Sequence, residues 1–381
     1  MRVLVLGAGQ LARMMALEAI PLNIEVQAFD VRSDQIVDPI NQQVLGEGLQ
    51  QALRDADVVT AEFEHIPQVV LEPCEQSGKF LPGSRAILSG GDRRIEKALL
   101  QQAGVASAAY AEVHSKAELE AAVQQLGLPL VLKSALEGYD GKGQWRLKQI
   151  EQIDAVWTEI AQFLKQASKK AKQGIVAEQF IPFDYEVSLV GARGKDGQCV
   201  YYPLTENHHV NGVLSVSLPR LAHPLQAQAE RMFQLLANEL DYVGVLAIEF
   251  FAVGDRLLVN EIAPRVHNSG HWSQQGADTS QFANHIRAVC GLPLGDTTLL
   301  RPTLMVNILG LDQLPDCVLG IAGVHLHWYG KAPRPGRKMG HINLAADSTN
   351  SLGQRFAELI ALLPAEDFPE LSQMQSRISI S

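Results

Sequence analysis

The chain has 381 residues, of which 46% are hydrophobic and 19% charged, and its formal net charge is −10. This length and composition suggest a soluble globular protein of two or three domains, and no apolar run approaches the ~18 residues of a membrane span. Because the acidic balance argues against nucleic-acid binding and the first residues do not resemble a signal peptide, we expect a cytoplasmic protein without nucleic-acid or membrane partners.

The first ninety residues alternate strand-like and helix-like segments, which predicts a parallel, doubly wound sheet. The predicted strands are residues 2–6, 24–29 and 57–60. The first ends in the turn Gly7-Ala-Gly-Gln-Leu-Ala12, the second ends at Asp30, and Glu62 follows the third. The turn with Asp30 matches a dinucleotide-binding fingerprint. Close packing of a βαβ unit, or a helix N-terminus that binds the phosphate of another small molecule, would explain the same turn.

A polar segment at residues 90–94 indicates a linker. Two helices follow it, one that ends at Gln102 and one over residues 115–126. The second begins with the capping box Ser115-Lys-Ala-Glu118, and Gly127 ends it. These signals predict that a new domain starts near residue 90.

A lysine and a glycine-rich loop come next along the chain. The strand 130–133 ends in Lys133, and the following loop has glycines at 138, 141 and 143, with Lys142 among them. Glycines let the backbone approach a polyphosphate closely, and a lysine neutralises its charge. The loop therefore suggests a phosphate-binding flap, with a flexible hairpin turn as the alternative.

A short apolar connection follows the next predicted strand, which ends in Glu178. It reads Gln179-Phe180-Ile181 and leads to a strand that carries Glu186 near its start. Bordered by two carboxylates, this connection would suit an adenine edge and a ribose, although its pattern fits a buried core equally well. Residues 203–214 look like a loop, and we interpret its two adjacent histidines as structural.

Residues 245–262 form two apolar runs around a turn, and each run carries one carboxylate. If the loop is 254–256, Glu249 and Glu261 lie directly opposite one another, roughly 4.5–5.5 Å apart. Two like charges there are costly unless a hard cation lies between them, and Mg²⁺ with substrate phosphates is the usual occupant. The donor-rich segment 263–272 follows, which suggests an adjoining anion site. A solvated hairpin with two surface glutamates is the alternative.

A helix is predicted over residues 280–290, and residues 301–381 look like a small further unit. Within this unit, four cations fall within eight residues and are held by prolines and a glycine. They are Lys331, Arg334, Arg337 and Lys338. In an acidic protein, this cluster favours a phosphate or nucleotide site over a solvated run.

The strand lysine, the glycine-rich loop, the carboxylate-bordered connection and the late carboxylate pair are together what phosphoryl transfer from ATP requires. Their order after a doubly wound domain resembles the ATP-grasp superfamily. Six segments are similar to the N5-carboxyaminoimidazole ribonucleotide synthetase family of purine biosynthesis: GAGQLARM, EGYDGKGQW, EVSLVGARG, PLTENHH, NEIAPRVHNSGHW and HWYGKAPRPGRKMGHIN. They extend over residues 7–343.

The resemblance implies an α/β protein of ATP-grasp architecture in four parts. They are an N-terminal doubly wound, Rossmann-like domain (1–90), a linker and central lid domain (91–182), a C-terminal grasp domain (183–300) and a small substrate-binding unit (301–381). It implies ATP-dependent carboxylation of 5-aminoimidazole ribonucleotide with bicarbonate, through carboxyphosphate. The expected cofactors are ATP and Mg²⁺, or Mn²⁺ in its place, and the expected assembly is a homodimer.

The resemblance also implies roles for individual residues. Those implied to bind the nucleotide are Arg93, Lys133, Gly138, Tyr139, Asp140, Gly141, Lys142, Gly143, Gln144, Glu178, Gln179, Phe180, Ile181, Glu186, His209 and Asn260. Those implied to be catalytic, by holding bicarbonate and carboxyphosphate, are Arg265, His267, Asn268 and Ser269. Those implied to bind the aminoimidazole ribonucleotide are Gln10, Leu11, Glu62, Tyr139, Asp140, Lys331, Arg337 and Lys338, the last three through its phosphate. Glu249 and Glu261 would bind the metal.

Three other functions were weighed. A formate-dependent glycinamide ribonucleotide transformylase shares the glycine-rich turn and the paired glutamates, but GYDGKGQ and HNSGHW favour the carboxylating family. An NAD-dependent dehydrogenase would explain the first turn and Asp30 but nothing after residue 130. A non-catalytic nucleotide-binding regulator would leave the two metal-binding carboxylates without a function.

Overall fold

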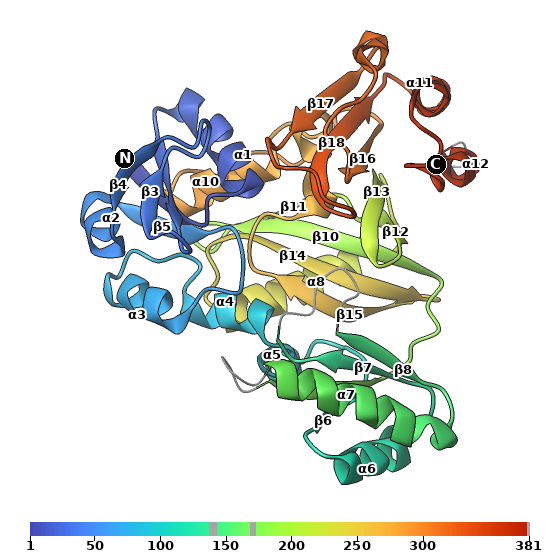
Figure 1. The fold of residues 1–381 in the computed structure, drawn as a ribbon. Coiled ribbons are helices and arrows are strands. Elements are labelled where there is room, and N and C mark those ends of the chain that lie inside the picture. Colours follow the sequence, from blue (N-terminus) through green and yellow to red (C-terminus); the bar gives the residue numbers. More distant parts are fainter. Residues whose placement is uncertain (137–142, 168–172, 379–381) are drawn as a thin grey trace.

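The structure, a computed structural model, describes residues 1–136, 143–167 and 173–378, and its strands form three sheets (Figure 1). The N-terminal sheet and its helices comprise β1 (Arg2–Leu6), α1 (Gln10–Ala19), β2 (Glu25–Asp30), β3 (Gln35–Val37), β4 (Val44–Glu47), α2 (Leu49–Asp55), β5 (Val58–Ala61) and α3 (Gln68–Gln76). β1 pairs in parallel with β2 and β5, as predicted, whereas β3 and β4 add an antiparallel edge. These two strands were not predicted, because three or four residues are too few to show a period-two pattern.

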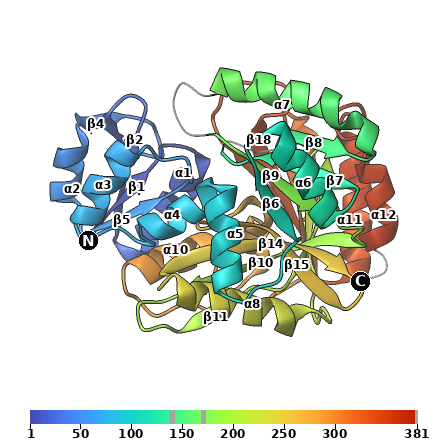
Figure 2. The ribbon, with the colours of Figure 1, turned by 90° about the horizontal axis from the view of Figure 1, so that it is seen from below.

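The central sheet has the order β6-β9-β7-β8 and antiparallel pairing. Its elements are β6 (Tyr110–Val113), α6 (Lys116–Leu126), β7 (Leu130–Ser134), β8 (Gln144–Leu147), α7 (Ile153–Ala167) and β9 (Ile175–Gln179). Both helices pack on the sheet and share one apolar core with it (Figure 2). The predicted cap of α6 is confirmed, since Ser115 Oγ accepts from the N–H of Glu118. The carboxylate of Glu118 accepts from the N–H of His114, one residue before the one expected for a capping box.

The third sheet is the largest, with the order β15-β14-β10-β12-β13-β16-β18-β17 and with β11 paired to β10. Its strands are β10 (Tyr185–Arg193), β11 (Cys199–Tyr201), β12 (Thr205–Val210), β13 (Val213–Pro219), β14 (Gly244–Val253), β15 (Arg256–Ala263), β16 (Thr303–Leu309), β17 (Val324–Trp328) and β18 (Lys338–Ala345). The last three strands therefore continue the sheet that the grasp region begins, so the expected small unit shares a sheet with its neighbour.

The expected loop at residues 203–214 is wrong. This stretch forms β12 and the start of β13, joined by a tight turn at Asn211 and Gly212, whose φ angles are 51° and 80°. Asn-Gly is the preferred pair for a two-residue hairpin turn, because both positions need positive φ. The sequence therefore carried the signal, and the hairpin places His209 on a strand beside β10.

The hairpin of β14 and β15 confirms the predicted opposition of Glu249 and Glu261. The register arises differently from the expectation, because the turn contains only Gly254 and Asp255. A bulge between Glu249 and Phe250 then leaves one residue of β15, Asn260, without a partner on β14. A bulge turns its strand locally and re-aims side chains. Asn260 and Glu261 consequently both line the same cavity.

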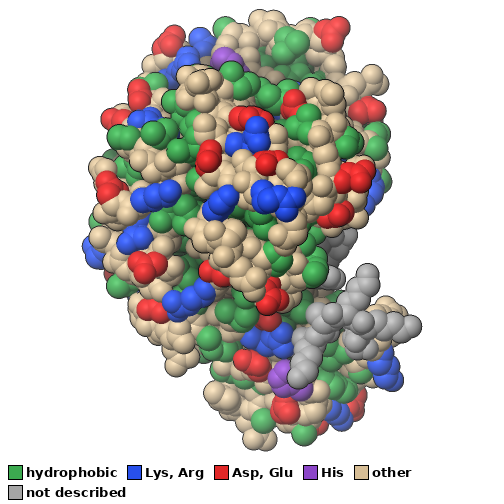
Figure 3. All heavy atoms as spheres, turned by 90° about the vertical axis from the view of Figure 1, so that its left-hand side faces the viewer, with side chains coloured by type: hydrophobic (Ala, Val, Ile, Leu, Met, Phe, Trp, Pro, Cys, Tyr) green, Lys and Arg blue, Asp and Glu red, His purple; other side chains and the backbone are tan. Residues whose placement is uncertain are grey.

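The remaining helices cover this sheet and its junctions. They are α4 (Ser84–Gly91), α5 (Arg93–Gln102), α8 (Gln226–Glu239), α9 (Ser273–Gly276), α10 (Gln281–Val289), α11 (Thr349–Leu362) and α12 (Leu371–Ile378). In the described ranges, no helix combines the length and the apolar character of a membrane span. Figure 3 shows charged side chains of both signs interspersed over one face of the molecule.

A buried histidine ties the N-terminal domain to the large sheet, where α10 lies beside α1 (Figure 1). His285 of α10 accepts from the N–H of Val245 at its Nδ1, over 3.0 Å, and its Nε2 lies 2.9 Å from Oγ1 of Thr60 on β5. Nε2 must therefore carry the proton that is donated to Thr60. Burial lowers the pKa of His285 to about 4.

We expect His285 to make the protein less stable in mild acid. The unfolded chain binds a proton at this residue below its ordinary pKa of 6.5, whereas the folded chain does so only near 4. The stabilisation is therefore present above about pH 6.5 and is lost as the pH falls towards 4, by about 3 kcal/mol in total. Urea unfolding at pH 7.5 and pH 4.5 should show that His285→Gln loses less stability on acidification than the wild type. The exposed His114→Gln variant should behave as the wild type, and equal acid losses in all three proteins would contradict this prediction.

Candidate active site

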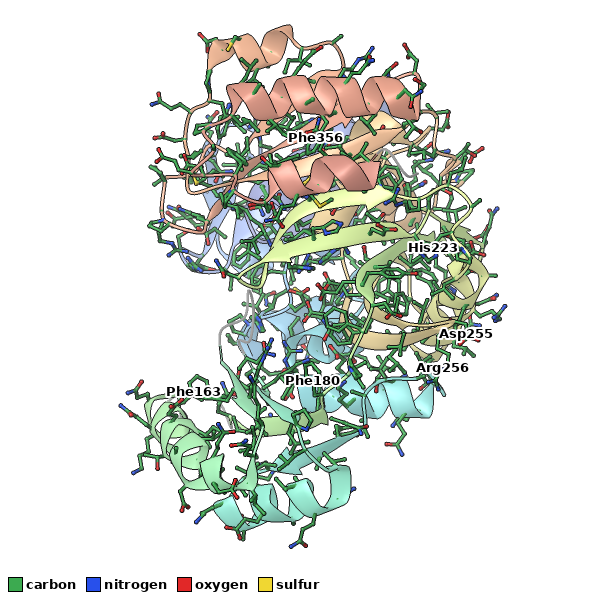
Figure 4. The ribbon with its side chains drawn as sticks, turned by 90° about the vertical axis from the view of Figure 1, so that its right-hand side faces the viewer. Phe163, Phe180, His223, Asp255, Arg256 and Phe356 are labelled. Carbon is green, nitrogen blue, oxygen red and sulfur yellow. The ribbon has the colours of Figure 1, made fainter. Side chains whose placement is uncertain are left out.

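A cavity of about 520 Å³ lies between the central sheet and the β14–β15 hairpin. Lys133 and Glu178 line it from the central sheet, and Glu249 and Glu261 line it from the hairpin. Figure 4 shows Phe180, another lining residue, at the junction of the central sheet and the large sheet. A hollow of about 630 Å³ beside the N-terminus is more open to solvent and is lined by none of the predicted site residues. The enclosed cavity is therefore the candidate active site.

Two carboxylates face the cavity from paired positions, Glu249 on β14 and Glu261 on β15. Burial and the charge of Glu261 raise the pKa of Glu249, while His209 and Lys338 oppose this shift. Arg93 approaches Glu261, with 3.5 Å between Nη2 and Oε2. Because neighbouring carboxylates resist ionising together, a divalent cation between them would be stabilised. The pair therefore fits a Mg²⁺ site.

The described residues contain no group of three or more His, Cys, Asp or Glu side chains that could hold a metal by themselves. Mg²⁺ usually binds through one or two carboxylates and takes its other ligands from water and substrate phosphates. A metal at Glu249 and Glu261 would thus depend on a phosphorylated ligand in the same cavity.

Glu178 lies between two lysines. Its Oε1 is 3.1 Å from Nζ of Lys97, and its Oε2 is 2.9 Å from Nζ of Lys133. Burial alone would raise the pKa of Glu178, but the charges of Lys133 and Lys97 hold it at about 2. Lys133 also donates to Oδ1 of Asn260 over 3.1 Å. Because two lysines share the single negative charge of Glu178, these three side chains keep one net positive charge that Lys133 can present to an anion.

Glu186 of β10 and His209 of β12 both line the cavity, with 2.9 Å between Oε2 and Nδ1. Burial alone lowers the pKa of His209, but the hydrogen bond with Glu186 and the charge of Glu249 outweigh it and raise the pKa above its ordinary value. His209 therefore lines the cavity while its Nδ1 shares a proton with the carboxylate of Glu186.

The segment after β15 brings Arg265, His267 and Asn268 to the cavity wall. Arg265 reaches the N-terminal domain, where its Nε lies 2.6 Å from Oε1 of Glu64. Asn268 donates to Oδ1 of Asn307 on β16 over 3.0 Å, and Asn307 donates back to Oδ1 of Asn268 over 2.7 Å. The segment is therefore fixed from two directions by residues far away in the sequence.

His267 lies between Glu249 on the cavity side and Ser269 in the protein interior. Its Nε2 is 3.4 Å from Oε1 of Glu249, and its Nδ1 is 2.9 Å from Oγ of Ser269. Burial, and then the charges of Arg265 and Lys338, lower the pKa of His267 well below its ordinary value. Ser269 is fully buried and is not among the described residues that line the cavity. Any role of Ser269 towards bicarbonate would therefore act through His267.

The carboxylate of Glu62 occupies the N-terminus of α1. It accepts from the N–H of Gly9 and, over 2.9 Å, from that of Ala12. A Cβ at Gly9 would lie 2.7 Å from Oε1 of Glu62, so a side chain there would displace this carboxylate from the helix N-terminus. Asp30 accepts from the N–H of Arg32 within its own turn, over 2.9 Å. Neither arrangement suits a dinucleotide, whose pyrophosphate needs free helix amides and whose ribose needs the acidic residue.

Two of the predicted phosphate-binding cations, Lys331 and Lys338, have different neighbours. Nζ of Lys331 lies 5.4 Å from the ring centre of Tyr329, and burial together with the charge of Arg337 lowers the pKa of Lys331 to about 8. Lys331 and Glu62 each shift the pKa of the other through their charges, which places Lys331 towards the N-terminal domain. Lys338 instead lines the cavity. The C-terminal loop therefore brings one cation towards Glu62 and another to the cavity wall.

The other predicted residues are placed as follows. Gly138, Tyr139, Asp140, Gly141 and Lys142 lie outside the described residues. Gly143, Gln144, Gln179 and Ile181 line the cavity. Gln10 and Leu11 begin α1 beside Glu62.

Lys97, Glu64 and Asn307 are not among the residues predicted from the sequence. Lys97 follows Arg93 by four residues in α5, a spacing that places both on one helix face, so this signal was present. Glu64 and Asn307 reach the site from segments distant in sequence, and no local pattern marks them.

Three domain families match successive parts of the chain. The ribonucleotide synthetase preATP-grasp domain matches residues 1–89, and the ATP-grasp domain matches residues 98–282. The phosphoribosylaminoimidazole carboxylase C-terminal domain matches residues 303–355.

Several relatives match this chain over nearly its whole length. The N5-carboxyaminoimidazole ribonucleotide synthase of Vibrio cholerae is 59% identical over 378 residues, which cover 99% of this chain and 100% of the relative. The solved N5-carboxyaminoimidazole ribonucleotide synthetase of Thermus thermophilus has a TM-score of 0.82 and 39% identity, over 95% of this chain and 98% of its own. The Aspergillus clavatus synthase, solved with ADP and 5-aminoimidazole ribonucleotide, has a TM-score of 0.81 and 28% identity, over 95% and 98%.

Proposed function

The chain belongs to the family of N5-carboxyaminoimidazole ribonucleotide synthases, and from this premise we propose how its residues divide the work of the reaction. The enzyme is an ATP-dependent ligase of purine biosynthesis (EC 6.3.4.18) that carboxylates 5-aminoimidazole ribonucleotide with bicarbonate. The observation that carries our assignment is that Lys133, the Glu249–Glu261 pair and His267 line one cavity.

ATP occupies this cavity in our proposal. Arg93 and Lys133 contact its phosphates, because both are cations on the cavity wall and Lys97 compensates the carboxylate beside Lys133. The connection 179–181 borders the adenine, and Glu186 with His209 lies beside the ribose. When bound at the two paired carboxylates, Mg²⁺ or Mn²⁺ supplies positive charge to the phosphate oxygens.

Bicarbonate lies next to the phosphates, held by Arg265, His267 and Asn268. One of its oxygens attacks the γ-phosphorus, and the bond from this phosphorus to the β-phosphate oxygen breaks, so that carboxyphosphate and ADP form. Arg265 and Lys338, both half-buried, face the charge that moves during this transfer, and cations fixed in a partly dry site stabilise such charge more strongly than water does.

The aminoimidazole ribonucleotide lies between Glu62 and the C-terminal loop, with its phosphate on Lys331 and Arg337. Its amine nitrogen attacks the carboxyl carbon of carboxyphosphate, the carbon–oxygen bond to phosphate breaks, and the nitrogen loses one proton. The chain contributes proximity, because the acceptor is held beside a short-lived electrophile.

We also propose that the protein is a cytoplasmic homodimer. Light scattering of the purified protein would test the dimer.

The activity is tested by following ADP release from ATP. We expect release that depends on both 5-aminoimidazole ribonucleotide and bicarbonate. Release that requires formate and glycinamide ribonucleotide, or an absence of ATP consumption with all substrates present, would overturn the assignment.

The acceptor site gives a prediction of its own. Lys331→Met should raise the KM for 5-aminoimidazole ribonucleotide about 10-fold or more and leave the KM for ATP unchanged, because it removes a charge-assisted contact to phosphate. The matched control is Arg334→Met, an exposed cation of the same loop, which should change neither constant. A rise in the KM for ATP alone would place Lys331 in the nucleotide site and contradict the proposal.

A further inference from the structure

A series of buried polar side chains connects three strands of the large sheet to His267. It begins at Ser217 on β13 and passes through Asn207 on β12 and Ser188 on β10 to Ser269. Ser269 lies in the short helix η3 (Asn268–Gly270), next to the imidazole of His267. Each of these polar groups is buried, yet the series ends at the cavity wall.

The hydrogen-bond directions in this series follow from one backbone contact. The N–H of Ser269 donates to Nδ1 of His267 over 3.4 Å, so Nδ1 carries a lone pair and no proton. Oγ of Ser269 lies 2.9 Å from the same Nδ1, and its hydroxyl must therefore donate to it. A hydroxyl has one proton, so Oγ of Ser269 can only accept from its other neighbour.

The remaining directions are then forced in turn. Ser188 donates to Oγ of Ser269 over 2.7 Å, which leaves Oγ of Ser188 as an acceptor. The amide Nδ2 of Asn207 donates to that oxygen over 2.9 Å. Oδ1 of Asn207 accepts from the hydroxyl of Ser217 over 3.0 Å. All donors therefore point along the series towards His267.

The consequence appears on the other side of the imidazole. With Nδ1 as an acceptor, a neutral His267 carries its proton on Nε2, which lies 3.4 Å from Oε1 of Glu249. In this tautomer the ring presents an N–H to the cavity and has no lone pair there. Such a group can donate to Glu249 or to an anion, and it cannot remove a proton from bicarbonate.

We propose that Ser188, Asn207 and Ser217 are positioning residues that hold His267 as a neutral donor with its proton on Nε2. The proposal rests on the proposed function, in which His267 contacts bicarbonate. Its role is then that of a fixed hydrogen-bond donor to the carboxylate oxygens as charge moves during phosphoryl transfer. Apolar residues would fill this part of the sheet without leaving polar groups to satisfy, so the series has a stability cost that a structural role alone does not require.

The tautomer is measured directly in the wild-type enzyme by two-dimensional NMR with ¹⁵N-labelled histidine. The His267 signals are assigned by their loss in His267→Gln. We expect a protonated Nε2 and an unprotonated Nδ1. A protonated Nδ1, or an imidazolium at neutral pH, would overturn the proposal whether or not the enzyme is active, and the expected tautomer in an enzyme without the expected activity would overturn the proposed function alone.

Two variants test whether the series sets this state. Ser188→Ala removes the donor to Ser269, and Asn207→Asp replaces a donating amide with an accepting carboxylate of nearly the same shape. Both should give a protonated Nδ1 in part of the molecules and lower kcat/KM for bicarbonate about 10–100-fold, by analogy with the range for residues that orient metal-ligating histidines. The KM for ATP should stay within about twofold of the wild-type value, because none of Ser188, Asn207 and Ser217 lines the cavity in which ATP is proposed to bind.

The matched control is Ser215→Ala. Ser215 is a buried serine of β13 that donates to Glu370 and stands outside the series. It should keep the wild-type tautomer and kinetics, and thermal unfolding of all three variants shows whether they are folded. If Ser188→Ala and Asn207→Asp are folded and also keep the wild-type tautomer and bicarbonate kinetics, the residues are structural and the proposal fails.

Discussion

Replacing Glu261 with glutamine is expected to lower kcat/KM by about 10²–10³-fold while leaving the protein at least as stable as the wild type. The activity falls because one of the two carboxylates that fit the metal loses its charge. The stability does not fall, because removing the charge of Glu261 relieves its repulsion of Glu249, and this gain offsets the lost ion pair with Arg93. Steady-state kinetics and thermal unfolding of the same preparations would show this divergence.

The control for this variant is Glu206→Gln. Glu206 is also a strand glutamate of the large sheet with an arginine partner, since its Oε2 accepts from Arg220 over 2.9 Å, and it does not line the cavity. It should keep near wild-type kinetics. Parallel losses of melting temperature and activity in Glu261→Gln would mean that Glu261 is a structural residue, and the proposed metal site would be wrong.

The second large effect is expected on the free energy of unfolding. Lys97→Met should lower the free energy of unfolding by about 3–5 kcal/mol, because it leaves Glu178 buried with one counter-charge instead of two. The same change should raise the KM for ATP, since Lys133 then has to balance Glu178 alone and has less charge to offer to a phosphate. Urea unfolding and ATP kinetics measure the two effects.

Lys116→Met is the matched control. Lys116 also begins a helix of the central region and forms an ion pair with Asp154, but both partners are exposed, so its removal should leave stability and kinetics unchanged. If Lys97→Met unfolds like the wild type, Glu178 does not depend on Lys97 for its charge. Lys97 would then not be the reason that Lys133 can offer positive charge to a phosphate.

The N-terminal domain shows how one local pattern can serve different chemistries. The glycine turn at residues 7–12 meets the requirements of a dinucleotide site, and the structure fills its helix N-terminus with the carboxylate of Glu62. An anion supplied by the chain itself removes the attraction that α1 would offer to a pyrophosphate. The same carboxylate lies within the electrostatic reach of Lys331, so the turn and the C-terminal loop face one another across the proposed acceptor site.

Local interactions were predicted well because they involve neighbours in sequence. The strand at residues 2–6, the cap of α6 at Ser115 and the end of α10 before Gly291 depend on hydrophobic periodicity, a side-chain oxygen at a helix N-terminus and a glycine after the last turn. The opposition of Glu249 and Glu261 was also predicted. The predicted three-residue loop gives the same register as the two-residue turn plus a bulge that the structure contains.

By itself, the sequence determined the longer elements outside residues 203–214, the carboxylate pair and, through the resemblance, the family. The tertiary structure decided which distant groups meet. It placed Lys97 against Glu178, Glu64 against Arg265 and Lys338 on the wall of the cavity. It also set the hydrogen-bond directions that end at His267. Charge balance and proton position depend on every group within a few ångströms, whatever its distance along the chain, and that neighbourhood exists only after the sheets have packed together.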